Sequence, residues 1–314
     1  MKKSLSIILV ICLGIISIKV ISEYGVIKNK EYNVNNNVLI KDYWKDNNLK
    51  LTRKIENNEE GSAVWVPTDI MVKNDKLFIF NTSIPSGGVS IGLGFKDDFL
   101  YYKTPREIIG LNLVNKDLKK IFSGIIGQAS FDENCNSFYI VDTLFENVTV
   151  MNNGEILSRL NMNDIFAKNN IKRMVGHRCF LKRNYIYVPS EFKYINSQEA
   201  YGGSEDYSEG IFIVDISTQK IKSIKSKGIE FGYYILGIDD KERIYTTTSY
   251  FVHRILVHDK HGNYLLEIKP NCTKYGKPVN SIYDELLVHP VYITEGGKVY
   301  IMIQTEEGTF IVSY

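Results

Sequence analysis

The stretch Ser137-Phe-Tyr-Ile-Val-Asp142 opens the pattern that decides the fold of this chain. It is followed by Val148-Thr-Val-Met151, by the turn Asn153-Gly154-Glu155 and by a short apolar run from Ile156 to Leu160. A second copy of the pattern runs from Arg243 to Ile268. Each copy predicts a strand, a loop, a strand, a tight glycine turn and another strand. Repeated strand units are typical of propellers and solenoids, so the repeat identifies an architecture and not a chemistry.

The pattern can be aligned five times along the chain. The first strands of the five units begin near Thr68, Gln128, His177, Tyr233 and Pro290. Short turns rich in Asn, Asp, Glu and Gly follow these strands, and such turns close hairpins because they tolerate positive φ. We therefore expect an all-β propeller over residues 49–314, with five blades favoured and six blades as the alternative.

The N-terminal part of this region is expected to close the ring. The last unit has no fourth strand before Tyr314, whereas Leu49–Ile55 alternates like a strand and resembles the fourth strand at Leu118–Phe122. We expect Leu49–Ile55 to complete the last blade, which removes an exposed sheet edge. The spare strand at Asn37–Tyr43 is what keeps the count of six blades open.

Two of the units resemble a known family of propeller blades. Phe138-Tyr-Ile-Val-Asp-Thr143, with Val148-Thr-Val150 and Asn153-Gly-Glu155, is similar to the NHL repeat and to TolB-like blades. The segment from Ile244 to Gly262 is similar to another such blade. The other three units match more loosely. The family includes binding scaffolds, protein-interaction modules and some enzymes, so the resemblance implies a fold and no single activity.

Residues 1–22 are predicted to be a targeting segment. Lys2 and Lys3 precede an apolar run that starts at Leu5, and residues 5–22 would form a helix about 27 Å long, close to the thickness of a bilayer core. We expect an uncleaved membrane anchor over residues 5–22, with a cleaved signal peptide or a lipid-modified Cys12 as alternatives. A polar linker over residues 23–48 and an exported, extracytoplasmic protein, membrane-anchored or secreted, complete this prediction.

Charge and motifs exclude several function classes. The 38 basic and 36 acidic residues leave a net charge of +2, which gives no footprint for nucleic acid. Cys135, Cys179 and Cys272 lack metal-ligand spacing, so we expect no metal, no cofactor and three unrelated cysteines, with one disulfide as the alternative. The sequence has no nucleophile-elbow, zincin or P-loop motif, which favours a binding protein over an enzyme.

Two long connections indicate where a ligand would bind. Asn81–Glu107 and Ser190–Gly210 each join the second and third strands of a unit, so both should lie on one face of the ring. The Gly-rich stretch Gly87–Gly94 is expected to be a flexible lid. We expect this face to hold a peptide, protein or glycan. The ligand-binding candidates are Tyr102, Arg106, His177, Arg178, Tyr201, Tyr207, Tyr233 and His289.

The alternative function is a carbohydrate-active hydrolase of the propeller type. Glycosidases need two carboxyl groups about 5–9.5 Å apart, here at the mouth of the central channel. The candidates are Asp69, Asp98, Glu191 and Asp206. The plain alternative for the acidic residues of 190–210 is a solvated loop.

Overall fold

The computed structural model describes residues 31–34, 38–42, 49–51, 66–74, 76–82, 89–171, 179–190, 207–248, 254–270, 291–305 and 308–314. The predicted targeting segment lies outside these residues. Within them, no helix has both the length and the apolar character needed to cross a membrane.

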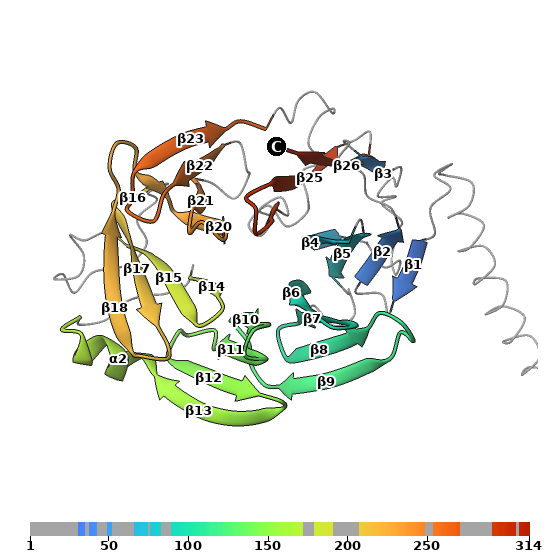
Figure 1. Ribbon diagram of the computed structural model, residues 1–314, viewed down its shortest axis with the longest axis horizontal. Coiled ribbons are helices and arrows are strands. Elements are labelled where there is room, and N and C mark those ends of the chain that lie inside the picture. Colours follow the sequence, from blue (N-terminus) through green and yellow to red (C-terminus); the bar gives the residue numbers. More distant parts are fainter. Residues whose placement is uncertain are drawn as a thin grey trace, which may run out of the picture.

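The strands form six four-stranded antiparallel sheets around a common axis (Figure 1). From the axis outward, sheet one contains β4 (Val66–Lys73), β5 (Lys76–Thr82), β2 (Val38–Asp42) and β1 (Glu31–Val34). Sheet two contains β6 (Ile91–Lys96), β7 (Phe99–Lys103), β8 (Glu107–Asn112) and β9 (Leu118–Ser123). Sheet three contains β10 (Gln128–Asp132), β11 (Ser137–Val141), β12 (Asn147–Asn152) and β13 (Glu155–Asn161).

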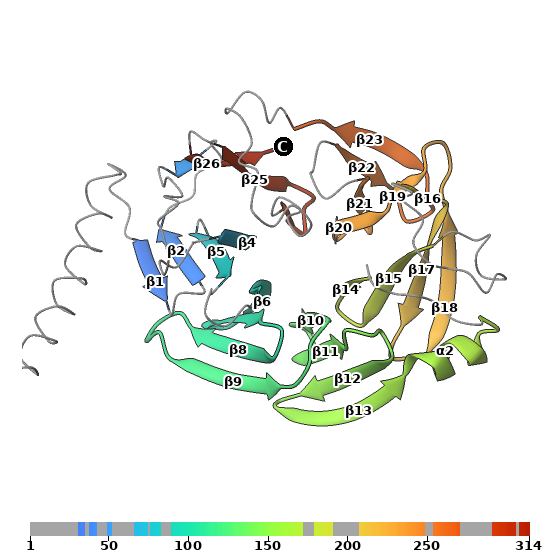
Figure 2. The same cartoon turned by 180° about the vertical axis from the view of Figure 1, so that it is seen from behind.

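The other three sheets complete the circuit, as the reverse view also shows (Figure 2). Sheet four contains β14 (Phe180–Lys182), β15 (Tyr185–Ser190), β17 (Gly210–Asp215) and β18 (Lys220–Lys225). Sheet five contains β20 (Tyr234–Ile238), β21 (Ile244–Thr247), β22 (Ile255–His258) and β23 (Tyr264–Ile268). Sheet six contains β24 (Val291–Ile293), β25 (Val299–Thr305), β26 (Gly308–Ser313) and β3 (Leu49–Leu51).

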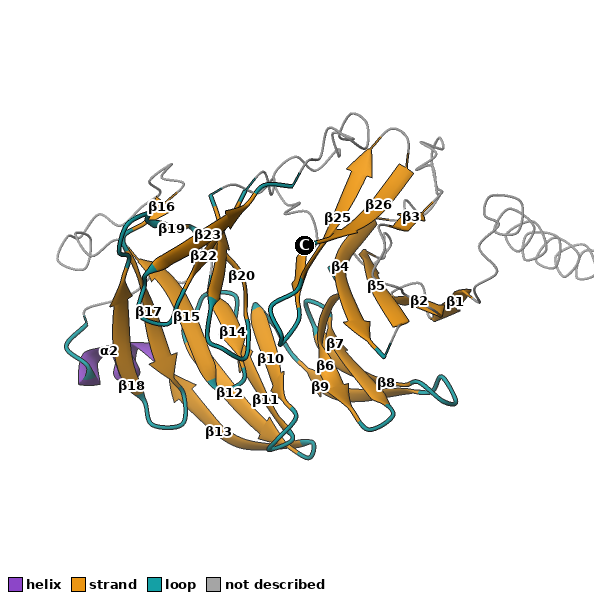
Figure 3. Ribbon diagram, turned by 45° about the horizontal axis from the view of Figure 1, so that its top comes forward, coloured by secondary structure: helices purple, strands orange, loops and turns teal. Residues whose placement is uncertain are grey.

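Two smaller elements lie outside these sheets. The helix α2 (Met162–Lys168) follows β13, and Asn161 caps it by accepting hydrogen bonds from the N–H groups of Asn163 and Asp164. A two-stranded sheet joins β16 (Tyr207–Ser208) to β19 (Phe231–Gly232). Figure 3 shows β16 and β19 at the end of the ring opposite the turn between β12 and β13.

The sequence pattern favours five blades and keeps six as the alternative, and the structure has six four-stranded sheets. The difference arises in Asn81–Glu107, which is expected to be an insertion with a flexible lid. Instead, Ile91–Lys96 and Phe99–Lys103 are strands joined by a two-residue turn at Asp97 and Asp98, so β6 to β9 form a sheet of their own. Asp97 has a φ of +50°, as such hairpin turns require.

The N-terminal strands supply the outer parts of two sheets. Val38–Asp42 pairs with β5 and Glu31–Val34 pairs with Val38–Asp42, so the expected polar linker contains two strands of sheet one. The apolar run Val38-Leu-Ile40 explains this, because β-branched and aliphatic residues favour strands. Leu49–Leu51 pairs with β26 in sheet six, which is the last unit of the sequence pattern and the one to which that pattern assigns Leu49–Ile55.

The buried hydrophobic residues of the described segments form six clusters, one between each pair of neighbouring sheets. Met71 and Phe80 of sheet one, for example, pack with Leu100 of sheet two. Each innermost strand contacts the innermost strand of both neighbouring sheets, from β4 through β24 and back to β4. The ring therefore fixes the relative positions of the residues at the starts of these strands.

Candidate binding site

The innermost strands all begin at the same end of the ring, which we call the front face. Asp69 lies near the start of β4, beside an irregularity in its pairing with β5. Its Oδ1 accepts a hydrogen bond from the N–H of Ile70 at 2.9 Å, and its Oδ2 accepts one from the N–H of Gly92 in sheet two at 2.8 Å. Burial raises the pKa of this carboxyl group to about 7, although both N–H groups and the charge of Lys103 act to lower it.

Lys103 is the basic partner of Asp69 on the front face. It ends β7, opposite Ile91 in the β6–β7 pairing, and is only 5% exposed. Its Nζ donates a hydrogen bond to the carbonyl of Gly127, next to sheet three, at 2.7 Å. Burial lowers the pKa of the ammonium group to about 8, against the opposing influence of Cys179 and Asp69. Asp69 and Lys103 thus link sheets one, two and three at one level of the ring.

A buried hydroxyl group lies between these two residues in the chain. Ser90 precedes β6 and is 1% exposed, and its carbonyl accepts a hydrogen bond from Thr68 Oγ1 at 2.6 Å. Within the described residues, the Ser90 Oγ has no hydrogen-bond partner. A buried hydroxyl without a partner costs about 1–3 kcal/mol, so this atom is a natural contact for a bound molecule.

Tyr292 of sheet six lies within electrostatic reach of Asp69. It is the central residue of β24 and packs against the clusters that sheet one forms with sheets two and six. Burial raises the pKa of its phenol group to about 12, and the negative charge of Asp69 contributes to the increase. We call Asp69, Ser90, Lys103 and Tyr292 the front-face cluster.

The cluster does not contain the carboxylate pair that a glycosidase needs. Gly92, which bonds to Asp69, is the second residue of β6, and the six residues from Gly92 to Asp98 span about 20 Å of extended chain. Asp98 is exposed in the turn at the opposite end of this strand. The distance between Asp69 and Asp98 therefore exceeds the range of about 5–9.5 Å that these enzymes use. Glu191 and Asp206 lie outside the described residues.

The predicted ligand-binding residues have different environments. Tyr102 is fully buried in the core between sheets one and two, so its side chain is a core residue and not a surface contact. Arg106 is exposed in the turn between β7 and β8, and Tyr233 is half-buried with its ring 6.0 Å from that of Tyr234. Tyr207 begins β16 and pairs with Gly232. His177, Arg178, Tyr201 and His289 lie outside the described residues.

Sequence reasoning does not find Ser90, Lys103 or Tyr292. The useful signal is the pair Asp97-Asp98 between two apolar runs, which is typical of a hairpin and would place Lys103 at a strand end. Cys135 and Cys179 are free thiols. In the described part of the chain, no group of His, Cys, Asp and Glu residues could hold a metal ion.

The architecture defines the class of protein: an all-β propeller built from four-stranded sheets. No protein-family model and no curated protein matches the sequence. The blade type of the NHL or TolB family stays a prediction.

Several solved structures are similar to this chain at a low level. Hydrazine synthase from Kuenenia stuttgartiensis is 9% identical with a TM-score of 0.39, covering 79% of this chain and 60% of its own. Hsv2 from Kluyveromyces lactis is 14% identical with a TM-score of 0.35, covering 67% of this chain and 69% of its own. Glutaminyl cyclase from Myxococcus xanthus is 8% identical with a TM-score of 0.40, covering 70% of this chain and 87% of its own. The chain thus spans about 60% of the hydrazine synthase chain, and similarity at this level carries no argument about activity.

Proposed function

We propose that the protein is a binding module that holds a peptide, a protein segment or a glycan on its front face. The observation that carries the proposal is the pair of oppositely charged residues Asp69, which is half-buried, and Lys103, which is buried, placed by neighbouring sheets. Burying charged groups costs stability unless they are well paired. Their position at the front ends of β4 and β7 supports a role in recognition, because ligand sites combine apolar walls with a few placed polar groups.

We also propose that the protein is exported and held at a membrane through residues 5–22. Lys2, Lys3 and the long apolar run that follows them support this. The pairing of Leu49–Leu51 with β26 supports the role of this N-terminal strand in closing the ring.

The alternative function, a carbohydrate-active hydrolase, has one observation in its favour. The pKa of Asp69, raised to about 7 by burial, is in the range of a general acid. The mechanism needs a second carboxylate, for which Glu191 and Asp206 are the remaining candidates.

The binding proposal can be tested with the full chain in detergent on arrays of defined peptides and defined glycans. We expect the wild-type protein to bind a set of related probes and Lys103→Met to lose them, because the ammonium group is removed at nearly constant side-chain length. Lys119→Met is the matched control, since Lys119 is exposed on the outermost strand β9. The proposal fails if the wild type binds no probe, or if Lys103→Met and Lys119→Met bind alike.

A further inference from the structure

The front-face cluster has hydrogen-bonding capacity that the described residues do not use. Each carboxylate oxygen of Asp69 accepts one backbone N–H, whereas a carboxylate can accept about four hydrogen bonds in all. Lys103 donates to Gly127, and an ammonium group has about three donors. The Ser90 Oγ is buried and has no partner among the described residues. The cluster thus offers an acceptor group, a donor group and a hydroxyl group.

The charges of the cluster favour a neutral ligand. Asp69 and Lys103 influence each other electrostatically, but in the described part of the chain they form no ion pair with each other. A charged ligand group would compensate one of them and leave the other buried and uncompensated, which is costly. A neutral group that reaches both by hydrogen bonds avoids this cost.

A hydroxyl group is a neutral group that can bond to a donor and to an acceptor that lie within electrostatic reach of each other. It can donate its hydrogen to Asp69 and accept a hydrogen bond from Lys103 with the same oxygen atom. An adjacent hydroxyl group on the same molecule would satisfy the Ser90 Oγ. Tyr292, half-buried in β24 and within electrostatic reach of Asp69, adds an aromatic side chain of the kind that ligand sites commonly contain.

We propose that the front-face cluster binds a neutral, hydroxyl-rich ligand, with one sugar unit held among Asp69, Ser90 and Lys103. The inference rests on the proposed binding function, and it selects the glycan from the three ligand classes named there. It also assigns the roles: Asp69 accepts, Lys103 donates and Ser90 contacts a neighbouring hydroxyl group.

Calorimetric titration of the full chain at neutral pH tests this assignment. The neutral probes are cellotriose, maltotriose and chitotriose, the acidic probe is trigalacturonate, and the peptide probe is tetra-alanine. We expect at least one neutral trisaccharide to bind, and Lys103→Met to weaken its Kd by at least about tenfold because a charged donor is lost. Ser90→Ala should weaken binding less, and Lys119→Met should leave it unchanged.

The outcomes separate this inference from the proposed function. If trigalacturonate or tetra-alanine binds and the neutral sugars do not, the binding function stands and the inference fails. If a neutral sugar binds equally well to wild type, Lys103→Met and Ser90→Ala, the cluster is not its site and the inference also fails. Thermal unfolding checks that each variant is folded. If Lys103→Met does not fold, the binding of the sugar to Ser90→Ala shows whether the cluster is its site.

Discussion

His258 is the clearest case of a titratable side chain enclosed by the fold. It ends β22 with 0% exposure, and its Nε2 lies 2.8 Å from the carbonyl oxygen of Ile229. Its ring lies 4.3 Å from the ring of Phe231 and 5.7 Å from that of Tyr264. Its Nδ1 has no partner among the described residues. The neutral form with the proton on Nε2 satisfies this environment, since it donates to Ile229 and places no proton on Nδ1.

Protonation of His258 should therefore destabilise the protein. Burial lowers the pKa of His258 below its usual value of 6.5, although the Ile229 carbonyl and Asp259 act to raise it. Because the folded state resists protonation, the stability that the neutral ring contributes is present above pH 6.5 and is lost as the pH falls below it. We expect urea unfolding to show that wild type loses more stability than His258→Gln between pH 7.5 and pH 5.5, about one pH unit on either side of this value.

His261→Gln is the control for this experiment, because His261 is exposed in the turn after β22. It should keep the pH dependence of the wild type. Asp69 titrates in the same range, but its contribution is common to all three proteins and cancels in the comparison. Parallel pH profiles for wild type and His258→Gln would contradict the prediction.

At the scale of the elements, the strands end in a repeated polar turn. Asp142, Asp215, Asp239 and Asp259 each accept hydrogen bonds from backbone N–H groups two to five residues further on. This use of Asp is typical of turns, because its short side chain satisfies the backbone groups that the strand leaves open. An aspartate that accepts hydrogen bonds from the N–H groups of the following turn therefore ends strands in sheets three, four and five.

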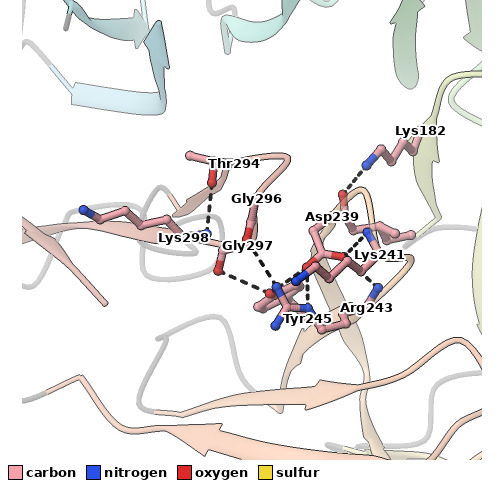
Figure 4. A network of polar contacts seen from close by, with 10 residues as sticks. Lys182, Asp239, Lys241, Arg243, Tyr245, Thr294, Gly296, Gly297 and Lys298 are labelled. Carbon is pink, nitrogen blue, oxygen red and sulfur yellow. Dashed lines mark hydrogen bonds and ion pairs between the residues drawn. The ribbon is translucent and has the colours of Figure 1, made fainter.

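Asp239 also belongs to a hydrogen-bond network that connects sheets five and six (Figure 4). Its Oδ2 accepts hydrogen bonds from Arg243 Nε at 2.5 Å and from the Tyr245 hydroxyl at 3.1 Å. Tyr245 and Arg243 also contact the carbonyls of Gly297 and Gly296 in sheet six. Gly297 has a φ of +85°, and a Cβ atom there would lie 2.0 Å from Arg243 Nη2, so glycine is required.

Asp239→Ala should destabilise the protein by about 1–3 kcal/mol, because it removes a buried acceptor that serves the Tyr245 hydroxyl and three part-buried N–H donors. Urea unfolding measures the effect, and Asp117→Ala, in an exposed turn, should change stability by less than about 0.5 kcal/mol. Equal effects of the two substitutions would show that the network does not hold sheets five and six together.

The sequence pattern predicts single hairpins well and predicts their partners poorly. The short runs of β-branched and aromatic residues at Ser137–Val141 and Ile244–Thr247 correctly predict strands, because each strand has a local signature. The pairing of β5 with Val38–Asp42 has no such local signature, because the two strands are far apart in the sequence and no turn joins them. Such pairings depend on packing between sheets, which a local pattern does not contain.

The candidate site likewise contains one residue that the sequence identifies and others that only the structure identifies. Asp69 is a candidate from the sequence, whereas its buried neighbours Lys103 and Ser90 become candidates only once β6 and β7 are placed as a sheet between sheets one and three. The helix α2 also has its signal in the sequence, an Asn161 cap with Asp164 in the first turn, but it is too short for periodicity to reveal it.

At the scale of the whole molecule, the N-terminal strands should be needed for stability. Removal of residues 1–51 takes away β1, β2 and β3 and leaves open edges on sheets one and six. We expect this truncation to lower the Tm by more than about 5 °C, and removal of residues 1–30 alone to leave it nearly unchanged. Calorimetry of both truncated proteins makes the comparison, and equal Tm values would contradict a closing role for these strands.

The pairing of β3 with β26 has a consequence for how the chain reaches its native state. Leu51 pairs with Thr309, 258 positions further along the chain (309 − 51). Sheets two, three and five are each built from consecutive strands, and only β16 falls between the strands of sheet four, so these sheets can form in order as the ribosome releases them. Sheet six has to wait until β26 is synthesised and then recruit β3, which leaves the ribosome long before it. Long-range pairing of this kind carries a large loop-closure entropy, so we expect this docking to be the slow, final step of folding.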